Sequence, residues 1–116
     1  SAQELIGLAE TCLAQKIKAK KYCSNEFSFS KIQYGNIKSF YGFAPKGAET
    51  SKPEIHHNEY EVCWVLKGKL RLLINNEEHI LLSGDAIQFD AILEHSYKAL
   101  SDIELILSHL QKNQRF

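Results

Sequence analysis

Several kinds of residue are scarce in this sequence, and each scarcity narrows the class of protein. The chain of 116 residues has no methionine, two prolines, one tryptophan and no excess of either charge, since its Lys and Arg residues and its Asp and Glu residues number 14 each. Without a clustered surplus of Lys and Arg, a broad phosphate-binding face is not expected. No apolar run approaches the length that spans a membrane, so no membrane partner is expected either.

Cysteine is also sparse. Cys12, Cys23 and Cys63 are odd in number and form no CxxC pair, which favours a reduced, cytoplasmic setting. The lack of methionine and the opening Ser1-Ala2 indicate an added remnant in front of an excised piece of a longer protein. On that interpretation, a neighbouring domain of the longer protein carries part of the function.

The start of the chain has the pattern of a helix. In "AQELIGLAETCLAQKIKAKK" the apolar residues recur at helical spacing, and nothing after Gly7 interrupts the run. We therefore predict a helix that ends near Lys20, followed by a short linker. The predicted division is a helix and linker over residues 1–24 and a β barrel over residues 25–116.

The remaining sequence changes to short segments rich in Phe, Tyr, Ile, Val and Leu, separated by turn residues at spacings typical of a β sandwich or barrel. "INNEEHI" is typical of a tight hairpin around Asn75-Asn76, because Asn tolerates positive φ. The expected strands lie at residues 26–33, 36–44, 60–68, 69–75, 77–83, 85–90, 95–100 and 103–110.

The segment "VCWVL", residues 62–66, is apolar at every position. A strand buried on one face alternates between apolar and polar residues, so both faces of this strand are expected to be covered. One face would line the barrel, and the other, with Val62, Trp64 and Leu66, needs a second layer. That layer is either the N-terminal helix or another copy of the chain, which is a modest argument for a homodimer.

Metal-binding side chains gather just before that segment, in "HHNEYE". In an extended strand residues two apart share a face, so His57, Glu59 and Glu61 would point one way and His56 the other. Two imidazoles and one carboxylate can hold iron, zinc, manganese or nickel. The alternative is a polar loop rim beside an ordinary core histidine.

The missing imidazole would come from a later part of the chain. His95 stands at the start of an expected strand, and His79 and His109 are the other candidates. His56 replaces His57 as the ligand only if a β-bulge shifts the strand by one residue.

The stretch from His56 to Ala99 resembles the two-part signature of the cupin superfamily. Gly68 fixes the register of the first part, which places Glu61 on the family's glutamate and His57 on its second histidine. Ile55 stands where the first histidine is usual, a departure that bears on metal binding.

In the second part of the signature, Gly84-Asp85 and His95 match, whereas Asp90 and Ile92 replace the usual proline and glycine. The resemblance implies a mainly β fold, the cupin-type double-stranded β-helix or jelly-roll barrel, here with one N-terminal helix. It also implies a pocket in which His57, Glu61 and His95 bind a divalent transition metal (Fe, Zn, Mn or Ni). Alternatively, with no metal at all, these residues and Tyr97 bind a small molecule directly.

The segment "GDAIQFDAILEHSYKALSDIELIL" is similar to the C-terminal cupin domains of XRE-type helix-turn-helix transcriptional regulators. That likeness implies a domain that senses a small-molecule effector and forms a homodimer, with nucleic acid bound only through a domain absent from this chain. No catalytic residue is assigned on this interpretation. The alternatives are a stand-alone metal-dependent cupin enzyme, of isomerase or dioxygenase type, and a structural or storage cupin. The residues that carry the likeness are Gly84, Asp85, Phe89, Asp90, Ala91, His95 and Tyr97.

Overall fold

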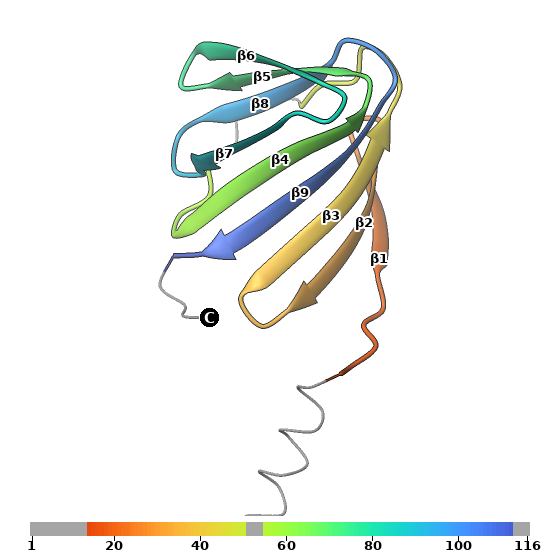
Figure 1. The fold of residues 1–116 in the computed structure, drawn as a ribbon, viewed down its shortest axis with the longest axis vertical. Helices are drawn as coiled ribbons and strands as arrows, with labels where there is room; N and C mark the ends of the chain where they lie inside the picture. The colour runs from red at the N-terminus through yellow and green to blue at the C-terminus, as the bar shows by residue number, and fades with distance from the viewer. Residues whose placement is uncertain (1–13, 51–54, 113–116) are drawn as a thin grey trace, which may run out of the picture.

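The protein forms two β-sheets that face each other, as the computed structural model shows (Figure 1). The structure describes residues 14–50 and 55–112. One sheet has six strands in the order β1-β2-β3-β9-β4-β7, and the other has three in the order β6-β5-β8. The strands are β1 (Lys20–Ser24), β2 (Phe27–Tyr34), β3 (Ile37–Ala44), β4 (Glu59–Lys67), β5 (Lys69–Ile74), β6 (Glu77–Leu82), β7 (Ala86–Asp90), β8 (His95–Ala99) and β9 (Ile103–Gln111).

All paired strands are antiparallel, and the pairing brings distant parts of the sequence together. The hairpin partners β1, β2 and β3 are neighbours in sequence, whereas β9, the last described strand, lies between β3 and β4 (Figure 1). Chain crossings from one sheet to the other produce the jelly-roll arrangement. The predicted mainly β, jelly-roll fold is confirmed.

The eight strands expected from the sequence are all present, each within two residues of its predicted bounds. The sheet also includes β1, which we did not expect, because residues 20–24 were assigned to the linker. The predicted helix falls mostly on residues 1–13, which lie outside the described residues, and residues 14–19 have no regular secondary structure. No helix in the described ranges is long and apolar enough to cross a membrane.

The hairpin between β5 and β6 forms as predicted. Asn75 and Asn76 have φ values of 49° and 67°, and Ile74 pairs with Glu77, so these two residues alone make the turn. Positive φ at both positions matches the right-handed twist of the strands. Asn adopts positive φ more readily than most residues, and for this reason the Asn75-Asn76 pair predicts the turn from the sequence.

The core lies between the sheets. Leu70 and Leu72 of β5 and Val65 and Leu105 of the larger sheet are each at most 1% exposed. Along β4 the inward residues are buried and the outward ones are partly or largely exposed, so this strand alternates in the structure although its sequence does not. The second layer expected over Val62, Trp64 and Leu66 is not supplied by any of the residues at 14–50 or 55–112, and Trp64 is 46% exposed.

Two glycines in connections between strands, Gly68 and Gly84, differ in how closely their surroundings are packed. Gly68 and Gly84 have nearly the same φ, 91° and 92°, but a Cβ at Gly68 would overlap the Asp102 carbonyl oxygen, whereas one at Gly84 would meet nothing within 4 Å.

We expect Gly84→Ala to cost about 1–3 kcal/mol of unfolding free energy through backbone strain alone. Gly68→Ala should cost clearly more, measured by urea unfolding, and equal costs would contradict the tight packing at Gly68.

Candidate metal centre and ligand pocket

Glu61 lies at the centre of the candidate site. Strand alternation points its side chain into the barrel, where it is 1% exposed. On the neighbouring strand β9, His109 pairs directly with it in register and is also buried. His109 Nε2 lies 2.8 Å from Glu61 Oε1. A buried carboxylate needs such a donor or a cation, because removing it from water is otherwise very costly.

His95 approaches Glu61 from the opposite sheet, as the first residue of β8. Its Nδ1 lies 2.8 Å from the Leu93 carbonyl oxygen, which can only accept a hydrogen bond. Nδ1 therefore carries the hydrogen, and in the neutral ring Nε2 keeps its lone pair. That nitrogen lies 3.5 Å from Glu61 Oε1, so a proton or a metal cation between the two atoms would relieve their repulsion.

His56 reaches the same place from the turn before β4. Its backbone N–H donates to the Ala91 carbonyl oxygen at 2.8 Å, which fixes the turn against the end of β7. The centre of its ring lies 5.4 Å from that of His95 and 5.2 Å from that of His109. The turn thus brings a third imidazole beside Glu61.

The structure corrects the sequence prediction at His57. We assumed an extended strand from His57 to Glu61, which would place both on one face. The strand begins only at Glu59, and Asn58 has a φ of 62°, in the left-handed region. This one residue reverses the alternation, so His56 turns towards the site and His57 is exposed. Ile55, at the family's first-histidine position, is also exposed.

The residues brought together suit a metal ion. His56, Glu61 and His95 each offer one ligand atom, and the three atoms lie within 4.8 Å of one another. Glu61 Oε2 is buried and accepts no hydrogen bond from any described residue. Together with the lone pair of His95 Nε2, this oxygen gives a donor set that a divalent transition metal prefers. The side-chain chemistry therefore fits a metal at this point.

The ionisation of Glu61 supports the same conclusion. Burial raises its pKa, but the neighbouring imidazoles of His109 and His95 lower it by more, so the pKa of Glu61 lies below its usual value. Glu61 is therefore ionised at neutral pH. An ionised carboxylate is the form that ligates a metal or accepts a hydrogen bond from a ligand.

A chain of polar side chains runs from Glu61 to the surface of the sheet. His109 Nδ1 lies 3.5 Å from Glu59 Oε1, and Glu59 Oε2 lies 2.8 Å from Lys38 Nζ on β3. Glu59 is buried on the same face as Glu61, as strand alternation predicted. The sequence gave His109 only as one of several candidates, because its pairing with Glu61 joins residues 48 positions apart. The sequence does place His109 two residues after Leu107 and four after Leu105, a spacing that puts all three side chains on one face of β9.

A cavity of about 230 Å³ opens beside this centre. Tyr97, predicted to bind ligand, lines it, and its hydroxyl group is buried without a hydrogen-bond partner among the residues that the structure describes. Phe40 lines the cavity, while Tyr41 and Phe43 project outward from the same strand. The lining residues are Tyr22, Ser24, Phe27, Phe29, Phe40, Thr50, His56, Glu61, Tyr97, Leu105, Leu107 and His109.

The remaining candidates lie elsewhere. His79 is on β6, with its Nε2 3.8 Å from Glu77 Oε1, and takes no part in the donor group. Cys63 is fully buried on the same face of β4 as Glu61, and burial raises the pKa of its thiol. It is therefore a small core residue and not a thiolate ligand at neutral pH.

Comparison with known proteins agrees with this architecture. Residues 41–109 match the family described as "Cupin domain". A curated relative, quercetin 2,3-dioxygenase of Bacillus subtilis, is 34% identical over 58 residues, which are 50% of this chain and 17% of that protein. The chain thus spans about a sixth of the length of that relative.

Solved structures show the same fold at low sequence identity. A predicted oxalate decarboxylase from Thermotoga maritima superposes with a TM-score of 0.70 and 16% identity, covering 83% of this chain and 94% of the other. A sugar phosphate isomerase of the cupin superfamily from Silicibacter pomeroyi gives a TM-score of 0.65 and 16% identity, covering 83% and 71%.

The buried pair of Glu61 and His109 can be tested by a double-mutant cycle. We expect Glu61→Leu and His109→Leu each to cost about 3–5 kcal/mol of unfolding free energy, because each leaves a buried polar partner uncompensated. The double variant should cost less than the sum, since neither partner then remains. Urea unfolding measures all three, with Gln88→Ala on the outer face of β7 as a neutral control. Additive costs would contradict the coupling.

Proposed function

We propose, because the chain belongs to the cupin family, that it binds a small organic molecule in the barrel pocket beside a divalent transition metal. His56, Glu61 and His95 would hold the metal. The observation that carries this proposal is the convergence of these three donors next to a cavity, with Glu61 Oε2 buried and accepting no hydrogen bond from the described residues. Iron, zinc, manganese and nickel all suit such a donor set.

The protein residues would have distinct tasks in this site. A metal held by three side chains supplies a Lewis acid with positions open to a ligand. His109, whose Nε2 lies 2.8 Å from Glu61 Oε1, would orient the carboxylate so that Oε2 stays available. The Leu93 carbonyl does the same for His95, because it fixes the hydrogen on Nδ1.

Of the uses for such a pocket, we favour a sensing and dimerising domain of a transcription regulator in the cytoplasm. Nucleic acid would be bound through a domain absent from this chain. The support is the likeness of residues 84–107 to regulator cupins together with an apolar sheet face that none of the described residues covers. The alternative is a metal-dependent enzyme, of isomerase or dioxygenase type, which the donor set and the partial likeness to quercetin 2,3-dioxygenase favour.

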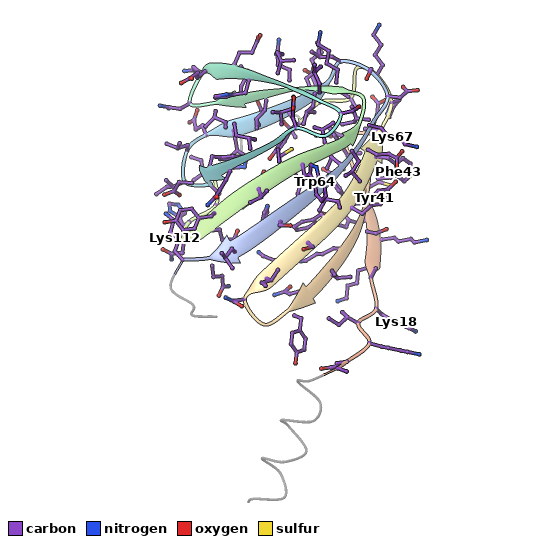
Figure 2. All side chains as sticks on the ribbon, viewed as in Figure 1. Lys18, Tyr41, Phe43, Trp64, Lys67 and Lys112 are labelled. Atoms are coloured by element: carbon purple, nitrogen blue, oxygen red, sulfur yellow. The ribbon has the colours of Figure 1, made fainter. Side chains whose placement is uncertain are left out.

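The apolar face supports the dimer part of the proposal. Tyr41, Ile106 and Trp64 are in register across β3, β9 and β4, and all three side chains point away from the core. Figure 2 labels Trp64 on β4 and Tyr41 and Phe43 on β3, with β9 between these strands. An exposed row of large apolar side chains on one sheet suits a second copy of the same sheet. Two sensing domains joined in this way would join two attached DNA-binding domains.

The metal centre is tested by a matched pair of neighbouring histidines. His56→Ala should lower the affinity for Zn²⁺ or Mn²⁺ at least about 100-fold, because one of three ligands is lost, whereas His57→Ala should leave it unchanged. Titration calorimetry measures both affinities. Native mass spectrometry of the purified chain should also show one metal ion per chain, retained in the His57→Ala variant.

Equal losses in the two variants would contradict the placement of His56 in the centre. A metal ion together with turnover of an added substrate would favour the enzyme alternative. A dimer that carries an organic molecule and turns nothing over would favour the sensing domain.

The dimer is tested by charging the centre of the apolar face. We expect the unaltered chain to sediment as a dimer at micromolar concentration and Trp64→Lys to sediment as a monomer, because a buried unpaired ammonium is strongly unfavourable. Ile80→Lys, at an exposed apolar position on the other sheet (39% exposed, against 46% for Trp64), should remain a dimer. A dimer that survives Trp64→Lys would place the interface elsewhere.

A further inference from the structure

We infer that the ligand of the pocket is a small uncharged ring compound that bears a hydroxyl group, with a simple phenol as the type. This inference rests on the proposed function, since it names the class of molecule that the same pocket would take. Four properties of the cavity support it: the residues of its wall, its volume, two buried polar atoms of its lining residues and its charge.

One wall of the cavity is built from aromatic side chains of β1, β2 and β3. The rings of Phe27 and Phe29 are stacked, with centres 5.8 Å apart and planes at 5°, and Phe29 meets Phe40 edge-on at 6.2 Å. The ring centre of Tyr22 lies 5.3 Å from that of Phe29, and Leu105 and Leu107 line the same cavity. Flat apolar rings pack well against such a surface, either stacked or edge-on.

The volume suits a molecule of one ring. A cavity of about 150 Å³ is enough to bind benzene. The cavity here measures about 230 Å³, which leaves room for a ring and a few substituent atoms. A molecule with three linked rings would project well beyond the enclosed part.

Two residues that line the cavity have buried polar atoms that need a partner. Glu61 Oε2 and the Tyr97 hydroxyl are both buried and make no hydrogen bond within the described ranges. A carboxylate oxygen accepts a hydrogen bond, whereas a tyrosine hydroxyl can donate one. A hydroxyl group on a ligand suits both, because it can donate to Glu61 and accept from Tyr97.

The charge of the cavity disfavours anions. None of the described lining residues is Lys or Arg, and the acidic residue among them is Glu61. Lys38 is engaged by Glu59, and Lys31 Nζ lies 5.7 Å from the ring centre of Phe40, outside the lining set. In the metal-free pocket a carboxylate or phosphate on the ligand would therefore meet no cationic side chain among the described lining residues. A molecule with many hydroxyl groups would leave most of them against the aromatic wall without partners.

Three probes of similar size separate these features: 4-methylphenol, its methyl ether 4-methylanisole and the anion 4-methylbenzoate. Binding to the full chain is measured by calorimetry, once with Zn²⁺ and once with a chelator. With the chelator present, we expect saturable binding of 4-methylphenol, at least tenfold weaker binding of the ether and no saturable binding of the anion. Tyr97→Phe should weaken 4-methylphenol and the ether alike, about 2- to 10-fold, because both oxygens can accept the hydrogen bond that the tyrosine hydroxyl donates. Tyr41→Phe, on the outer face of the sheet, should change neither.

Equal binding of the phenol and the ether would overturn the role of the hydroxyl group, and tighter binding of the benzoate would overturn the charge argument. If Zn²⁺ binds through His56 while no probe binds, the ligand class is wrong and the proposed metal site stands. If neither Zn²⁺ nor any probe binds, the proposed function fails together with this inference.

Discussion

One buried carboxylate, Glu61, governs the arrangement of its neighbours. An ionised group at the centre of a small barrel is stable only if donors or cations surround it. His109 Nε2 lies 2.8 Å from one oxygen, His95 approaches from the facing sheet, and His56 lies beside both rings. The polar chain continues through Glu59 to the partly exposed Lys38 on β3, so the charge inside is connected to charge that water can reach.

The sequence predicts the strands well because each is a local pattern bounded by turn residues. It places Glu61 correctly too, since the alternation of β4 is unbroken from Glu59 onward. The prediction fails just before Glu59, where Asn58 adopts a positive φ and the choice between His56 and His57 reverses. A single backbone angle decides that choice, and the residue pattern carries no signal for it beyond the tolerance of Asn for this conformation.

Other features could not be predicted because they depend on pairing over long distances in the chain. The role of His109 follows from the register between β4 and β9, which no local pattern encodes. Similarly, Lys20–Ser24 has no strong strand propensity and forms β1 because β2 offers a free edge to pair with. The uniformly apolar run at residues 62–66 predicts a cover over both faces of β4, but no described residue covers the outer face, where Trp64 is 46% exposed.

The position of β9 has a consequence for how the protein matures. Within the large sheet, β9 is the strand that joins β1, β2 and β3 to β4 and β7. It is also the last described strand to be synthesised (Figure 1). Until it inserts, the two halves of the large sheet have no shared hydrogen bonds and Glu61 has no His109. We therefore expect β3 and β4 to keep unpaired edges during translation until β9 has been made. The pocket should form late, when β9 pairs with both of these strands.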